Sequence, residues 1–220
     1  STTCVTSAPP PSPPPWSRTL QAAPLPLGKV AAVLDRSYST AGSRDKARRP
    51  LALALAVDQL LALAAREYRS FWTGPGSVGP HDDPLQHEPR GQTDLATPLL
   101  DALAWAPDLV IIVSDGFDND PTRGAGEVCR VFRTRLDPDR RTTIVHINPV
   151  FDAPHLGPKP LDRSIPTVGL RDAEDLATVL AFARFADGGS LGELEDYLAH
   201  RAGFFAGRTF RFVLRTSIQA

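Results

Sequence analysis

The sequence predicts an α/β protein, built as a three-layer, doubly wound sheet of mostly parallel strands with helices on both faces. Short apolar runs, which are typical of buried strands, alternate along the chain with longer segments that have helical patterning. The strongest runs are apolar on both faces, which is typical of the central strands of a parallel sheet. The chain has 220 residues, enough for one such domain with short extensions.

The strands and helices can be assigned in order along the chain. Strands are predicted at residues 29–34, 68–72, 108–114, 142–148 and 167–170. Helices are predicted at residues 50–68, 97–106, 120–136, 172–187 and 190–202. Pro50 and Pro98 suit a first helical turn, and Ser190 with Glu193 forms a capping box. The helix at 50–68 has leucines on nearly all of its faces, so we expect it to be deeply buried.

The two ends of the chain fall outside this alternation. Residues 1–27 are rich in proline and predict a linker, or a strap packed over the domain. Residues 28–206 are predicted to form the α/β domain. In residues 207–220, phenylalanine and leucine alternate with arginine, which predicts an edge strand or a tail.

Charge and cysteine content narrow the classes of function. The formal net charge is −1, whereas a nucleic-acid-binding protein is usually clearly basic. The two cysteines, Cys4 and Cys129, form no disulfide framework, which favours a reducing compartment. No signal-peptide pattern and no membrane-spanning apolar run occurs in this chain. We therefore expect a cytoplasmic protein with no membrane segment in this chain, and nucleic acid is not the expected partner.

Oxygen-bearing side chains gather where two of the predicted strands end. Asp35, Ser37 and Ser39 follow the first strand at alternate positions, so they project to the same side of an extended chain. Asp115 follows the most apolar strand, and Thr93 lies in a glycine-led loop between the two. Ligands of doubly wound sheets bind at the carboxyl ends of the strands. These hard oxygen donors suit Mg²⁺ or Mn²⁺, and Ca²⁺ less well, whereas Zn²⁺ is disfavoured.

The composition of this ligand set also predicts a kind of partner. Two carboxylates and three neutral hydroxyls leave a divalent cation short of anionic ligands. The cation should therefore remain electrophilic and favour one more carboxylate, supplied from outside. We expect a binding module without enzymatic activity, in which the metal grips an Asp or Glu of a protein partner.

The same segments resemble the metal-ion-dependent adhesion site of the von Willebrand factor A family. The family pattern is Asp-x-Ser-x-Ser after the first strand, a Thr in a Gly-x-Thr loop, and the Asp of an Asp-Gly pair after the fourth strand. All three occur here in that order, and the resemblance covers roughly residues 29–202. It implies that Ser37, Ser39 and Thr93 coordinate the metal directly or through water. Asp35 and Asp115 would act partly through water and orient the other ligands.

The resemblance also implies a setting for the interaction. Arg36, Tyr38 and Gly116 lie between or beside the metal ligands, and we expect them to contact the partner. Arg36 stands where the family usually has a small residue, and its cation could crowd the site. Bacterial intracellular members of the family often resemble accessory parts of AAA+ ATPase assemblies. An AAA+ ATPase, or another domain of the same system, is therefore the expected type of partner.

Two other functions stay open as alternatives. A Mg²⁺-dependent phosphoryl-transfer hydrolase would use the same rim, but it needs a second acid where Ser37 stands. None of the three lysines, Lys29, Lys46 and Lys159, is expected near the rim to neutralise a phosphate, and no phosphate-binding glycine loop occurs. An RNA-associated module of the Ro type has little support, because basic and aromatic residues are not interleaved.

Overall fold

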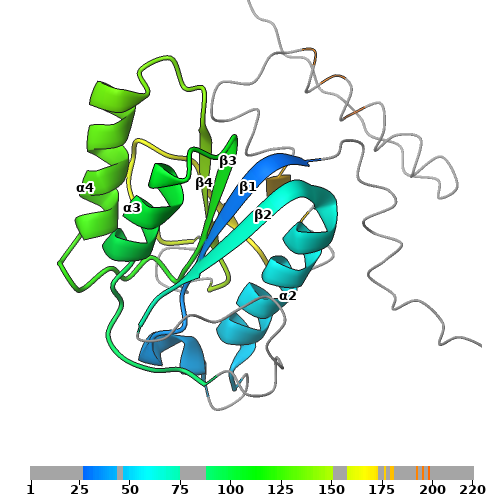
Figure 1. Ribbon diagram of the computed structural model, residues 1–220. Coiled ribbons are helices and arrows are strands. Elements are labelled where there is room, and N and C mark those ends of the chain that lie inside the picture. Colours follow the sequence, from blue (N-terminus) through cyan, green and yellow to red (C-terminus); the bar gives the residue numbers. More distant parts are fainter. Residues whose placement is uncertain are drawn as a thin grey trace, which may run out of the picture.

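The computed structural model describes residues 27–43, 47–74, 88–150 and 158–172, with six single helical positions between 176 and 198. Within these ranges, parallel strands form one sheet that is covered by helices on both faces (Figure 1). The predicted α/β class is therefore confirmed. The proline-rich start at residues 1–26 and the predicted edge strand at 207–220 lie outside the described residues.

The sheet has the strand order β2-β1-β3-β4-β5, and every pairing is parallel. Its strands are β1 (Leu27–Leu34), β2 (Ala65–Trp72), β3 (Leu109–Val113), β4 (Thr143–Asn148) and β5 (Thr167–Gly169). The chain adds β2 on one side of β1 and the later strands of the described part, β3 to β5, on the other side. In doubly wound sheets, such a reversal leaves a crevice at the carboxyl ends of the two strands that flank it. Here those two strands are β1 and β3.

Helices lie against both faces of this sheet. They are η1 (Tyr38–Ala41), α2 (Arg49–Ala64), α3 (Ala96–Ala104), α4 (Gly124–Val131) and η3 (Phe132–Leu136), a π-helical turn that continues α4. Figure 1 shows α2 on one face of the sheet and α3 and α4 on the other. The exposed side chain of Leu63 shows that α2 is less deeply buried than predicted. No helix among the described residues is long and apolar enough to cross a bilayer.

The side chains of β1 alternate between two separate hydrophobic cores. Val30, Ala32 and Leu34 pack on the face covered by α2, whereas Ala31 and Val33 pack on the face covered by α3 and α4. All five are fully buried, and β3 divides its side chains between the two cores in the same way. The uniformly apolar sequence of these strands is therefore explained by burial on both faces.

The second strand begins earlier than the sequence predicts. The helix expected at residues 50–68 ends at Ala64, and β2 starts with the next residue. Arg66 and Glu67 favour helices by intrinsic propensity, so local sequence does not explain this boundary. β2 instead pairs in parallel with the full length of β1, and this tertiary pairing overrides the local preference.

The helix predicted at residues 120–136 begins later than expected, at Gly124. Arg123 has a left-handed conformation, with a φ angle of 61°, and so cannot belong to the helix. The preceding residues form a turn in which the Gly124 amide donates to the Pro121 carbonyl. The cap comes from further upstream, because the Asp118 carboxylate accepts a hydrogen bond from the Ala125 amide at 2.7 Å.

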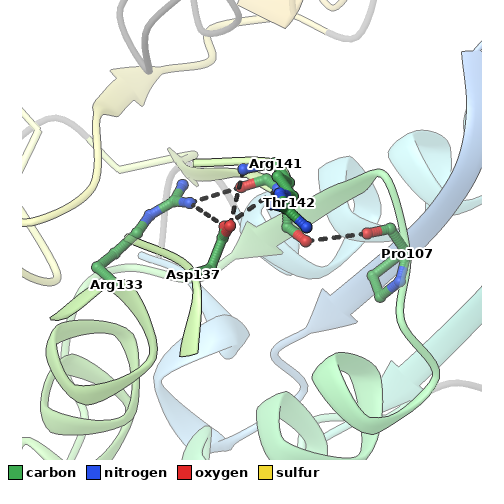
Figure 2. Close-up of polar contacts among 5 residues, drawn as sticks. All are labelled: Pro107, Arg133, Asp137, Arg141 and Thr142. Atoms are coloured by element: carbon green, nitrogen blue, oxygen red, sulfur yellow. Dashed lines mark hydrogen bonds and ion pairs between the residues drawn. The ribbon is translucent and has the colours of Figure 1, made fainter. Parts of the chain in front are cut away.

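A buried ion pair ties the end of η3 to the start of β4 (Figure 2). The Arg133 guanidinium donates to Asp137 at 2.9 Å and to the Thr142 carbonyl, and both charged side chains are more than 90% buried. The Asp137 carboxylate also accepts hydrogen bonds from the Arg141 and Thr142 amides. The Thr142 hydroxyl donates to Pro107, so the cluster also holds the loop that leads into β3.

We expect Asp137→Ala to lower the free energy of unfolding by about 3 kcal/mol, because it leaves the Arg133 cation buried without its carboxylate. Urea unfolding followed by circular dichroism measures this change. Asp139→Ala is the matched control, because the Asp139–Arg141 pair is exposed and should contribute less than about 1 kcal/mol. Equal effects of the two substitutions would contradict the assignment of the buried pair as a structural lock.

Candidate metal-binding site

The five predicted ligands lie at one rim of the sheet, where β1 and β3 end. Asp35 follows β1 directly, and its amide donates to the Val113 carbonyl at the end of β3. Asp115 follows β3 after one intervening residue. Thr93 arrives from the segment that precedes α3. The rim therefore coincides with the point at which the strand order reverses.

Asp35 is held through one of its two carboxylate oxygens. Its Oδ1 accepts hydrogen bonds from the Ser37 amide at 2.8 Å and from the Thr73 hydroxyl at 3.2 Å. Its Oδ2 is buried and accepts no hydrogen bond from the described residues. Burial raises the pKa of Asp35 to about 6, and the negative charge of Asp115 adds to this effect. The two carboxylates therefore lie close enough to repel each other.

The three hydroxyls form a continuous hydrogen-bonded group. Thr93 donates to the Ser37 hydroxyl at 2.9 Å, and the Ser37 and Ser39 hydroxyls are also 2.9 Å apart. Ser37 and Thr93 are buried, whereas Ser39 is exposed, so the group opens to solvent at Ser39. The structure thus brings together Ser37, Ser39 and Thr93, as the spacing in the sequence predicts.

Backbone contacts explain how Thr93 reaches β1 across more than fifty residues. The Tyr38 amide donates to the Gly91 carbonyl, and the Arg90 amide donates to the Arg36 carbonyl. Gly91 has a φ angle of 74°, in the left-handed region that suits glycine. The Thr93 carbonyl in turn accepts the amides of residues 119 and 120, beyond β3. The Thr93 loop is therefore fixed to both of the strand ends that carry carboxylates.

The Asp115 turn is braced by groups that the sequence did not single out. The Asn148 amide, at the end of β4, donates to the Asp115 carbonyl and to the Lys159 carbonyl, each at 3.0 Å. Gly116 has a φ angle of 80°, and a Cβ there would lie 2.7 Å from the Lys159 carbonyl oxygen. A side chain at Gly116 would therefore be strained and would also clash with the backbone.

A buried histidine contacts Ser114, the residue directly before the Asp115 turn. The Nε2 of His146 lies 3.0 Å from the Ser114 carbonyl, and its Nδ1 lies 3.1 Å from the Thr167 hydroxyl. A carbonyl can only accept, so Nε2 carries the proton and Nδ1 accepts from Thr167. Burial lowers the pKa of His146 to about 4, which keeps the ring neutral. His146 is therefore a buried core residue with both ring nitrogens hydrogen-bonded.

The three residues predicted to contact a partner lie in different environments. Tyr38 is 69% exposed and lies between Ser37 and Ser39 in the sequence, beside the three hydrogen-bonded hydroxyls. Gly116 is buried and has the structural role described above. Arg36 is 8% exposed, and its Nε donates to the Thr73 carbonyl at 2.8 Å. The Arg36 head group is thus held at the end of β2. Phe117, which the sequence did not single out, is an exposed aromatic beside Asp115.

Thr73 and Lys159 are two further rim residues that sequence reasoning missed. The Thr73 hydroxyl accepts from the Arg36 amide at 2.9 Å and donates to Asp35, so it orients the carboxylate. Its position directly after a predicted strand was the available signal. The expectation that no lysine lies near the rim is wrong, because Lys159 packs on Gly116 and its ammonium lies 3.2 Å from the centroid of the Phe117 ring.

The donor set fits a hard divalent cation. A buried carboxylate oxygen without a hydrogen-bond donor, beside a second carboxylate and three hydroxyls, is an arrangement that a cation would compensate. Among the described residues, no three His, Cys, Asp or Glu side chains form a cluster that could hold a metal. Any metal here would therefore depend on hydroxyl and water ligands, which suits Mg²⁺ or Mn²⁺ better than Zn²⁺.

We expect Asp35→Asn to stabilise the metal-free protein at pH 7.5. The raised pKa means that the free energy of unfolding falls as the pH rises from about 4 to 6, by about 3 kcal/mol in total. The neutral amide avoids this cost, and after its own burial cost a gain of about 1–2 kcal/mol remains. Urea unfolding in EDTA measures the gain, which should vanish at pH 4.

Asp101→Asn, at an exposed position on α3, is the matched control and should change the stability little at either pH. If Asp35→Asn destabilises the chain at pH 7.5 in EDTA, Asp35 has a compensating partner and the site is not built around an uncompensated charge.

No protein-family model matches the chain, and no curated protein matches it significantly. The case for a function therefore rests on the residues of the rim and their chemistry.

Proposed function

We propose that this chain is a divalent-cation-dependent binding module of the von Willebrand factor A type. Its rim binds Mg²⁺ or Mn²⁺ through Asp35, Ser37, Ser39, Thr93 and Asp115, and the cation grips an Asp or Glu of a protein partner. The observation that carries the proposal is the buried Asp35 oxygen that no described group satisfies.

The energetic cost of the buried Asp35 charge favours a site that is kept for function. A buried carboxylate with an unsatisfied oxygen and a carboxylate neighbour weakens the folded state, as the raised pKa of Asp35 records. Such strain is typical of sites whose charge is matched by a ligand. A divalent cation would remove both the desolvation cost and the repulsion from Asp115. The resemblance to the von Willebrand factor A pattern supports the same reading.

The shape of the rim favours a protein partner. The buried side of the site holds Asp35, Ser37 and Thr93, while Ser39 is exposed. Exposed aromatic side chains stand on both strand ends: Tyr38 after β1 and Phe117 after β3. Aromatic residues around a polar centre are enriched in protein interfaces, where they supply apolar contact area. An acidic residue flanked by apolar residues is the complementary ligand, and an AAA+ ATPase assembly remains the proposed setting.

One feature of the rim would favour the alternative function, phosphoryl transfer, and two features disfavour it. Lys159 provides a cation close to the rim, which the sequence did not predict. Ser37 still stands where the second acid would be required. Asp35 is 1% exposed, so as a nucleophile it would be poorly accessible to a phosphate ester. Binding without chemistry therefore remains the better-supported function.

The first test is Mn²⁺ binding, followed by the electron paramagnetic resonance signal of the free ion. We expect one Mn²⁺ per chain, competed by Mg²⁺, with binding lost in Asp115→Asn and in Ser37→Ala. The Asp101→Asn protein should bind as the wild type does. Acetate added to the Mn²⁺-loaded protein should reduce the water-proton relaxation enhancement, because a carboxylate displaces metal-bound water.

Absence of Mn²⁺ binding at millimolar concentration, or binding that survives both site substitutions, would overturn the metal site. A parallel assay with p-nitrophenyl phosphate separates the alternative. Mg²⁺-dependent turnover that is lost in Asp35→Asn would favour the hydrolase over the binding module.

Thr73 positions Asp35, so its hydroxyl should affect metal binding. Thr73→Val removes the hydroxyl while keeping the shape, so the Asp35 carboxylate loses one of its hydrogen-bond donors. We expect the Mn²⁺ affinity to fall roughly tenfold, as is usual when a group that orients a metal ligand is removed. Thr73→Ser should retain the affinity.

The matched control is Thr142→Val, which removes a hydroxyl that contacts Pro107 at the opposite end of the sheet. It should lower stability without changing the Mn²⁺ affinity. An unchanged affinity in Thr73→Val, measured on the folded protein, would show that the Ser37 amide alone orients Asp35.

A further inference from the structure

Lys159 is a fixed cation beside the proposed metal site. Its backbone packs on Gly116 and is tied to the Asp115 carbonyl through the Asn148 amide. Its ammonium group lies 3.2 Å from the centroid of the exposed Phe117 ring. No carboxylate of the described residues forms an ion pair with it. The cation is therefore positioned by an aromatic ring, which leaves its hydrogen-bond donors available.

The charge around the site is uneven. The two positive charges of a bound divalent cation would neutralise the carboxylates of Asp35 and Asp115. The ammonium group of Lys159 would then be an additional positive charge, beside Gly116.

A cavity of about 470 Å³ lies next to Thr93 and reaches Trp72 and Gly74 at the end of β2. Its lining includes three acidic side chains, Asp94, Asp101 and Asp120, and the Arg36 guanidinium lies close to Gly74. Three acids beside one arginine leave the cavity side net acidic, so a second negative group on a partner would be attracted to the Lys159 side instead.

We propose that Lys159 is a second anchoring point for the partner, and that it binds a second carboxylate close to the one that the metal grips. The recognised segment is thus an acidic peptide with two acidic residues. This inference rests on the proposed metal-dependent function and specifies its ligand.

The spacing of the two acids follows from the position of Phe117. The ring that holds the Lys159 ammonium belongs to the second residue after Asp115, and two residues of chain span at most about 7 Å. An extended partner advances by about 3.3 Å per residue. Two acidic side chains two or three positions apart can therefore reach the metal and Lys159 at the same time. The Phe117 ring also offers an apolar surface to the residues between them.

The test is selection of peptides from a random phage-displayed library on the immobilised chain, with Mg²⁺ or with EDTA. We expect the wild-type chain in Mg²⁺ to select peptides with two acidic residues two or three positions apart. Selection on Lys159→Gln should yield single acidic residues without a fixed second one. A synthesised wild-type-selected peptide should bind Lys159→Gln roughly three- to fivefold more weakly, and Lys159→Arg should restore binding.

Lys29→Gln is the matched control, because Lys29 also lies over an aromatic ring, that of Trp105, but on β1 near the start of β3. It should select the same peptides as the wild type. Mg²⁺-dependent selection of singly acidic peptides that is unaffected by Lys159→Gln would overturn the second anchor and leave the metal function intact. Absence of any Mg²⁺-dependent acidic selection on the wild type would overturn both.

Discussion

The position of β1 between two parallel partners is the constraint on which the rest of the molecule depends. β1 pairs with β2 along its whole length and with β3 along its last five residues, so the three strands end together. Asp35 leaves β1 at that edge, with Thr73 after β2 and Asp115 after β3. The hydrogen bonds of the sheet thus bring Asp35, Thr73 and Asp115 to one edge, and the Thr93 loop joins them through its own backbone contacts.

The same pairing makes charge at the rim energetically costly, because burial of the strands on both faces also shields the residue that follows β1 from solvent. Asp35 inherits this burial, and the fold satisfies only one of its oxygens. At the opposite end of the sheet, Arg133 and Asp137 neutralise each other and bond to nearby backbone groups. One chain therefore contains a compensated buried pair at one end of the sheet and two mutually repelling carboxylates at the other. The contrast supports the proposal that the second place binds an external cation.

The fold class, the succession of strands and helices along the chain and the group of five rim residues could all be predicted from the sequence, whereas the order of the strands within the sheet comes from the structure. A buried strand can be recognised from its apolar sequence alone, and residues that directly follow neighbouring parallel strands must lie at the same edge of the sheet. The boundaries of β2 and α4 could not be predicted, because pairing with β1 and the left-handed Arg123 override local preference. Thr73 and Lys159 were missed for a related reason: their roles arise from contacts with residues that are distant in the sequence.

The position of Lys159 changes how the charge of the rim is understood. In the sequence, the predicted rim contains two acids, three hydroxyls and one arginine. On that basis, the bound cation by itself would have to attract an acidic partner. In the structure Arg36 is turned toward the end of β2, and the cation beside Asp115 comes instead from the loop after β4. Under the proposed function, positive charge would extend from the bound cation to Lys159. This would give an acidic partner a direction as well as an anchor, because a single metal–carboxylate bond leaves rotation about itself unrestricted.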